Sequence, residues 1–116
     1  MVYMAESAAG ALLEICAHTP ADDVPPSFTL LRVVGPDVAA EEIALASLPL
    51  RWVDMPDATQ GIGAEWLKSG RTALLRVPSA MVPETWNILL NPAHPDAAHF
   101  QIERSYDYPF DLRLKR

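Results

Sequence analysis

One acidic side chain lies on a helical face that has room for a ligand. A helix is predicted over residues 7–18, because Ser7 can cap its first turn and alanine and leucine favour helices. Glu14 follows Gly10 by four residues and precedes His18 by four, so at about 3.6 residues per turn they share one face with Ser7. The small neighbours leave space beside the carboxylate. The alternative, an ordinary solvated helix position, is not excluded by spacing alone.

Two hydroxyl-bearing side chains are further candidates. Ser79 follows an apolar stretch and lies between Pro78 and Pro83, and proline restricts the backbone and would fix the direction of the hydroxyl. The sequence has no G-x-S-x-G motif, so Ser79 is not an evident nucleophile, and a simple turn serine is the alternative. Tyr3 belongs to a short apolar stretch that leads directly into the helix. It is either a ligand-stacking ring or a core tyrosine with its hydroxyl at the edge.

The histidines and glycines do not form a familiar cofactor motif. His94 and His99 are five residues apart with Asp96 between them, but the chain has no H-E-x-x-H and no pair of cysteines. We therefore expect no metal site. Gly61 and Gly63 lack the preceding strand and the third glycine of a dinucleotide-binding loop.

The elements that position these side chains are short, because eleven prolines interrupt the chain. Helices are predicted at residues 7–18, 39–46 and about 59–68, the last one stopping near Gly70. Strands are predicted at 2–4, 28–34, 50–53, 72–77, 86–90, 100–106 and 110–112. The pattern predicts an α+β fold with a small mixed sheet and short helices, in one domain over residues 1–116.

Charge and composition exclude several classes of protein. The net charge is −6 and no basic stripe is visible, which argues against direct nucleic-acid binding. The single basic cluster is Arg113, Lys115 and Arg116 at the C-terminus. No apolar run approaches the roughly 20 residues that span a bilayer, and no signal peptide is visible. With one cysteine, Cys16, we expect a cytoplasmic protein without membrane contact.

Five segments of the chain, in this order, resemble the RES family of bacterial toxins. They are VYMAES at 2–7 with ALLE at 11–14, GAEWL at 63–67, LRVPSAMVP at 75–83, NILLNPAHP at 87–95, and FDLRL at 110–114. The proline–serine turn followed by the asparagine–proline–histidine block is the most specific part. The resemblance extends over nearly the whole chain.

The resemblance implies a fold similar to ADP-ribosyltransferase toxins and an activity on NAD, which would be a substrate and not a cofactor. Members degrade NAD by phosphorolysis or hydrolysis, or transfer ADP-ribose to a protein. They act in type II toxin–antitoxin systems and are neutralised by a helix-turn-helix antitoxin of the Xre type. Whether this chain forms a homo-oligomer is left open.

The same resemblance implies roles for individual residues. Glu14, Ser79 and Tyr3 match the active-site glutamate, serine and tyrosine of the family. Cleavage of the nicotinamide–ribose bond passes through an oxocarbenium-like state, which Glu14 would stabilise. Tyr3 would contact the nicotinamide end, and Ser79 the substrate or an incoming phosphate. Asn91 and His94 would either contact NAD or hold their loop.

One family feature has no counterpart here. The family arginine lies in a G-R-x-N stretch upstream of the tyrosine strand, whereas two residues precede Tyr3 in this sequence. Arg71 is no substitute, because it follows the tryptophan helix. We therefore expect an N-terminally incomplete RES-like domain. The alternative to an NAD-degrading toxin is a truncated, inactive domain that only binds the antitoxin.

Overall fold

A four-stranded mixed sheet forms the centre of the molecule. In the computed structural model, which describes residues 1–114, its strands lie in the order β1 (Val2–Ala5), β5 (Trp86–Leu90), β4 (Leu74–Pro78) and β3 (Ala40–Glu42). β1, β5 and β4 pair antiparallel, and β3 runs parallel to β4. This arrangement confirms the predicted α+β fold with a small mixed sheet. Lys115 and Arg116 of the basic cluster lie outside the described residues.

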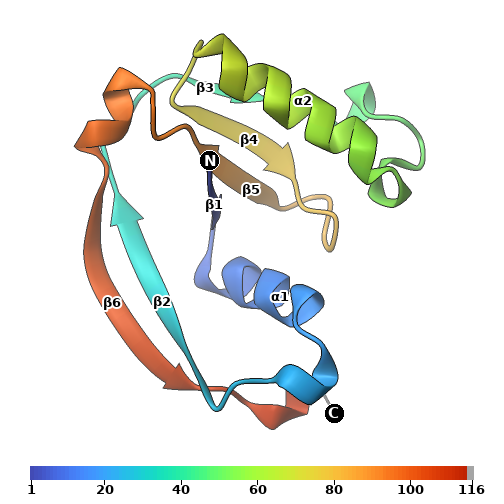
Figure 1. Ribbon diagram of the computed structural model, residues 1–116, viewed down its shortest axis with the longest axis vertical. Helices are drawn as coiled ribbons and strands as arrows, with labels where there is room; N and C mark the ends of the chain where they lie inside the picture. Colours follow the sequence, from blue (N-terminus) through green and yellow to red (C-terminus); the bar gives the residue numbers. More distant parts are fainter. Residues whose placement is uncertain (115–116) are drawn as a thin grey trace.

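Helix α2 (Pro56–Ser69) covers one face of this sheet (Figure 1). The helix begins at Pro56, and proline suits the first turn because an N–H group there would have no partner within the helix. The helix ends at Gly70, whose φ of 65° is in the left-handed region. Trp66 is 1% exposed and packs against Leu75 and Leu89 of the sheet. The apolar core of the sheet therefore lies beneath α2.

Helix α1 (Ala8–His18) follows β1 directly and contributes no fully buried side chain. Ser7 caps it: the Ser7 hydroxyl accepts a hydrogen bond of 3.0 Å from the Gly10 amide. In Figure 1 α1 lies below the sheet, close to the loop that connects β4 and β5. Over residues 1–114, neither α-helix is long and apolar enough to cross a membrane.

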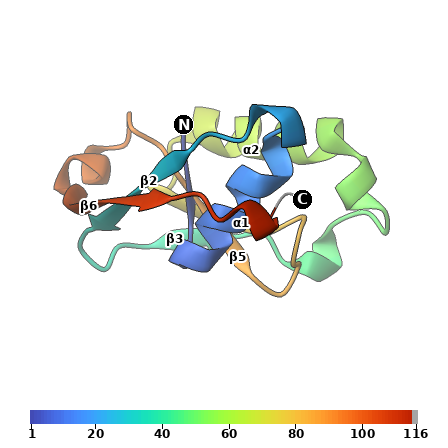
Figure 2. The same ribbon diagram turned by 90° about the horizontal axis from the view of Figure 1, so that it is seen from below.

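The remaining strands form a separate two-stranded ribbon. β2 (Ser27–Val34) and β6 (Gln101–Pro109) pair antiparallel, with a register shift between Arg32 and Val33. The ribbon runs along the left side of the molecule in Figure 1. Figure 2 shows how flat the molecule is, with a shortest extent of 21 Å against 40 and 37 Å in the other directions. At one end of the ribbon Phe28 meets the buried Phe110 edge to face.

Three predicted elements are wrong. Residues 39–46 do not form a helix, because residues 40–42 pair with β4 and the Ile43 amide extends this contact by donating to the Arg76 carbonyl. Residues 50–53 do not form a strand: Leu50 is fully exposed, and a 3₁₀ turn (Trp52–Asp54) leads into α2 instead. Residues 110–112 do not form a strand: β6 ends at Pro109, and a 3₁₀ turn (Leu112–Leu114) follows. Tertiary pairing outweighs local propensity at residues 39–46, and flanking prolines interrupt the strand predicted over 50–53.

Candidate active site

A single carboxylate joins α1 to the sheet. Oε1 of Glu14 accepts hydrogen bonds from the Ser79 hydroxyl at 3.0 Å and from Nδ2 of Asn87 at 2.9 Å. Its other oxygen, Oε2, lies 3.5 Å from Nε2 of the exposed His18. The Glu14 side chain is 26% exposed, so Glu14 is not an ordinary solvated helix position. We call Glu14, Ser79 and Asn87 the carboxylate cluster.

Ser79 is buried at the start of the loop between β4 and β5, with 3% of its surface exposed. Its amide donates to the Thr85 carbonyl at 2.8 Å, which closes the loop. The Ser79 hydroxyl also accepts from the amides of Met81 and Val82, at 3.1 and 3.3 Å. A hydroxyl has one proton to donate and two lone pairs. All three are used here, so in this arrangement Ser79 holds the loop and the Glu14 carboxylate.

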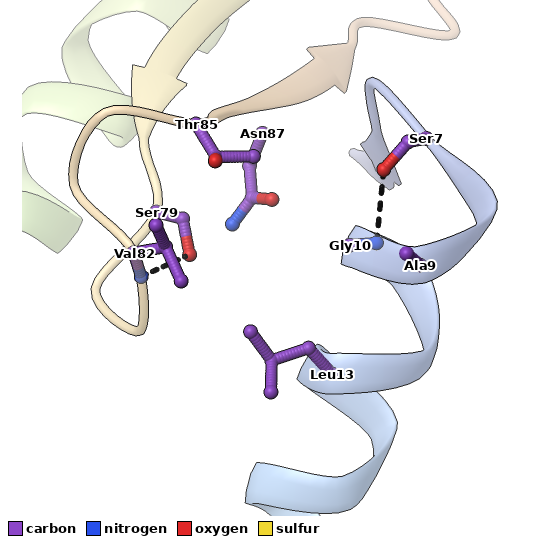
Figure 3. A pocket seen from close by; sticks show the side chains of 8 residues that line it. All are labelled: Ser7, Ala9, Gly10, Leu13, Ser79, Val82, Thr85 and Asn87. Atoms are coloured by element: carbon purple, nitrogen blue, oxygen red, sulfur yellow. Dashed lines mark hydrogen bonds between the residues drawn. The ribbon is translucent and has the colours of Figure 1, made fainter.

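A hollow of about 200 Å³ lies between α1 and this loop. In Figure 3 the side chains from α1 and its cap line one side of it, and those from the loop and β5 line the other. Its lining residues are Ser7, Ala9, Gly10, Leu13, Ser79, Val82, Thr85 and Asn87. Pockets that enclose a drug-sized ligand measure roughly 300–1,000 Å³. The hollow can therefore take one ring-sized end of a longer ligand.

Asn87 is the member of the carboxylate cluster that the sequence did not single out as a site residue. It lies in β5, where it is opposite Ala5 on one side and Val77 on the other. The signal was available: Asn87 is the one polar residue in an otherwise apolar strand, Trp86–Leu90. A polar side chain at such a position needs a partner, and Glu14 supplies it.

Tyr3 lies on the same face of the sheet as Asn87. It is opposite Leu89, two residues along β5 from Asn87, and such diagonal neighbours are about 7–8 Å apart. The tyrosine itself is 75% exposed and does not line the hollow. The structure therefore brings Tyr3 to the site's side of the sheet but gives it no contact within the carboxylate cluster. The exposed aromatic ring of Tyr3 is accessible to a ligand.

Asn91 and His94 lie at the opposite end of β5. Asn91 is 4% exposed; its Nδ2 donates to the Leu67 carbonyl at 3.4 Å, and its Oδ1 accepts from the Ala93 amide at 3.0 Å. Nδ1 of His94 accepts from the Asp96 amide at 3.1 Å. Four residues along a strand measure about 13 Å, so neither side chain is brought to the carboxylate cluster. Their contacts hold the loop after β5.

Comparison with known sequences identifies the family. The family model of the RES domain matches residues 1–111 of this chain. The chain belongs to the RES family. It is 39% identical over 121 residues to the Prs ADP-ribosylating toxin of Sphingobium sp. (strain YBL2), covering all of this chain and 75% of that toxin. Toxin Res of Pseudomonas putida is 39% identical, covering 98% of this chain and 79% of the toxin, and Toxin Res of Photorhabdus laumondii is 33% identical, covering 97% and 74%.

Other charged groups of this RES domain lie outside the hollow. Arg71 binds Glu65 through Nη1 and Nη2, at 2.8 and 3.0 Å, and Glu41 through Nε at 3.0 Å. The hydrogen bond from Arg71 lowers the pKa of Glu65, and Glu65 and Glu41 raise the pKa of Arg71. Among residues 1–114, no lysine or arginine lines the hollow. Within residues 1–114, no group of three or more side chains is placed to hold a metal ion.

Proposed function

We propose that this RES domain is a toxin that cleaves the bond between nicotinamide and ribose in NAD, with Glu14 as the catalytic carboxylate. The observation that carries the proposal is the position of Glu14, which does not line the hollow itself but accepts hydrogen bonds from Ser79 and Asn87, two residues that do line it. Relatives at 39% identity are named as toxins, one of them ADP-ribosylating, which supports a reaction on the same bond.

The chemistry requires a fixed negative charge. When the nicotinamide–ribose bond breaks, the cationic ring leaves as neutral nicotinamide and positive charge develops on the ribose. A carboxylate already aimed at that carbon stabilises the transition state more than the bound substrate, which is the condition for catalysis. The leaving group needs no acid, and so a single carboxylate is sufficient for the cleavage step.

The remaining residues are assigned by their contacts. The hollow would take the nicotinamide ring, with Leu13 and Val82 providing apolar surface, and the exposed ring of Tyr3 would pack against the ligand where it leaves the hollow. Ser79 would act through Glu14 and not on the phosphate acceptor, because its hydrogen-bonding capacity is already used. Asn91 and His94 would only hold their loop.

Cleavage leaves an ADP-ribosyl group that needs an acceptor. Phosphate and water would give NAD phosphorolysis and hydrolysis respectively. A protein acceptor is the second candidate, and the name of the Sphingobium relative specifically favours it. The three reactions share the Glu14 step and differ in the final product.

Membership of the RES family supports a proposal for the biological setting. A toxin that consumes NAD would act in the cytoplasm and would be neutralised by a helix-turn-helix antitoxin from the same toxin–antitoxin system. The net charge of −6 favours an antitoxin surface with basic residues. Antitoxin binding by a chain that leaves NAD intact would instead support the binding-module alternative.

The test is NAD cleavage by purified protein, measured as nicotinamide release with and without phosphate and with a candidate acceptor protein. Glu14→Gln should slow release by about a hundredfold or more, because it removes the charge that opposes the oxocarbenium ion. Glu65→Gln is the matched control: it makes the same change on α2, outside the hollow, and should leave the rate unchanged. Equal rates for Glu14→Gln and the unmodified protein would contradict the proposal.

A further inference from the structure

Two donors converge on one oxygen of Glu14, and the second of them comes from the central part of the sheet. We propose that Asn87 is a positioning residue that fixes which oxygen of Glu14 faces the substrate. The inference rests on the proposed function, because it takes Glu14 as the carboxylate that stabilises the ribosyl cation. Oε1 is the anchored oxygen, and Oε2 is the reacting one.

The contacts define this division. Nδ2 of Asn87 and the Ser79 hydroxyl both reach Oε1, at 2.9 and 3.0 Å. An ionised carboxylate only accepts hydrogen bonds, so the amide must turn its NH₂ group, and not its oxygen, towards Glu14. Oε2 lies 3.5 Å from His18, whose side chain is 78% exposed. The exposed His18 side chain can rotate away when a ligand binds. Ser79 and Asn87, the two donors to Oε1, do not have this freedom.

The two donors differ in how rigidly they are held. Ser79 begins a loop, whereas Asn87 lies within β5 and is paired on both sides, with Ala5 of β1 and Val77 of β4. A strand inside a sheet has less freedom than a loop, so Asn87 provides the fixed reference. Without Asn87, the Oε1 atom of Glu14 would keep only the hydrogen bond from Ser79, which lies in a loop. Helix α1 has no fully buried residue that could hold Glu14 in place.

This role predicts a particular kinetic signature. Asn87→Ala should lower kcat for nicotinamide release by about 10- to 100-fold, because the carboxylate loses its alignment, with little change in KM. Asn87→Asp should lower kcat more than Asn87→Ala. It keeps the shape of the side chain but places a second carboxylate against Oε1, and two such groups cannot both stay ionised. Gln101→Glu, which makes the same amide-to-acid change on the exposed ribbon, should leave kcat unchanged.

Two results would overturn the inference. A purely structural role for Asn87 would make the isosteric Asn87→Asp more active than Asn87→Ala. A change in KM with kcat retained would make Asn87 a substrate-binding residue. Thermal melting of all variants separates loss of fold from loss of alignment. If Asn87→Ala does not fold, the kcat of Asn87→Asp is compared with that of Gln101→Glu instead.

A spectroscopic readout separates this inference from the proposed function. The NMR signals of the Asn87 side-chain amide protons should differ clearly between the unmodified protein and Glu14→Gln, because the substitution replaces the carboxylate oxygen that accepts from Nδ2. That result is expected even if the chain leaves NAD intact, which would reject only the proposed function. Amide signals that do not respond to Glu14→Gln would reject the positioning role.

Discussion

Each of the two α-helices presents one glutamate to a partner outside the helix, and the two carboxylates are held in opposite ways. Glu65 of α2 gives both oxygens to the guanidinium of Arg71 in a bidentate pair. Glu14 of α1 is held through one oxygen by two neutral donors, and no arginine or lysine reaches it through a salt bridge in the described chain. A carboxylate that is already paired with a guanidinium is less able to stabilise positive charge on a ligand. Glu14 keeps one oxygen, Oε2, outside the two hydrogen bonds from Ser79 and Asn87.

The helices differ in packing as well. α2 buries Trp66 against Leu75 and Leu89, whereas α1 has no fully buried side chain, and its Glu14 is hydrogen-bonded to Asn87 of the sheet. The stability of the sheet is therefore concentrated under α2, and the groups suited to chemistry are concentrated at α1. This separation allows the site to be altered without loss of the fold.

The largest effect is expected under α2. Trp66→Ala should lower the free energy of unfolding by about 3–5 kcal/mol, because it empties the centre of the core and removes the hydrogen bond from Nε1 to the Thr72 hydroxyl. Trp52→Ala, at a half-buried position in a 3₁₀ turn, is the matched control and should cost less. Urea unfolding measures both. Equal losses would show that the core is not concentrated at Trp66.

Sequence reasoning brought Glu14 and Ser79 together through chain order and not through geometry. Glu14 and Ser79 were paired because both match a family pattern, and their contact joins residues 65 positions apart. No helical or strand periodicity can reveal a contact of that kind. The role of Asn87 was missed because its significance depends on the register of β5 against β1, which brings it opposite Ala5 beside the start of α1. A polar residue in an apolar strand was the available clue.

The fold was predicted best where local signals and tertiary packing agree. The helix over 7–18 and the strand over 86–90 match α1 and β5, because capping and β-propensity both favour them there. The predicted helix over 39–46 failed because parallel pairing with β4 is a non-local contact. The strand predicted over 50–53 failed because it lies between prolines and has no neighbouring strand with which to pair.

A smaller effect is expected at the start of α1. Ser7→Ala should lower the free energy of unfolding by about 1 kcal/mol, because the Gly10 amide loses its cap. Since α1 has no buried side chain, this loss should appear mainly as faster hydrogen exchange of the first α1 amides. The amides of α2 are the internal control and should be unaffected. Loss of protection in both helices together would show that α1 and α2 unfold as one unit.

The smallest effect is expected at the exposed pair of α2, and it should depend on pH. The hydrogen bond from Arg71 lowers the pKa of Glu65 from its usual 4.5, so the ionised form is favoured in the folded state. The pair therefore contributes stability above about pH 4.5, and this contribution is lost as the pH falls through the lowered pKa. The contribution should be small, because water and salt screen an exposed pair.

Melting temperatures of Arg71→Ala and the unmodified protein, measured from pH 7 to pH 3, test this prediction. The two values should approach each other as the pH drops below 4.5, since protonation of Glu65 removes from the unmodified protein one of the two interactions that the substitution removes, the other being the hydrogen bond from Arg71 to Glu41. Added salt should narrow the difference at pH 7 in the same way. A difference that stays constant with pH and salt would mean that the aliphatic part of Arg71 stabilises α2 by packing, and the contrast between a paired Glu65 and an available Glu14 would then be weaker than the geometry indicates.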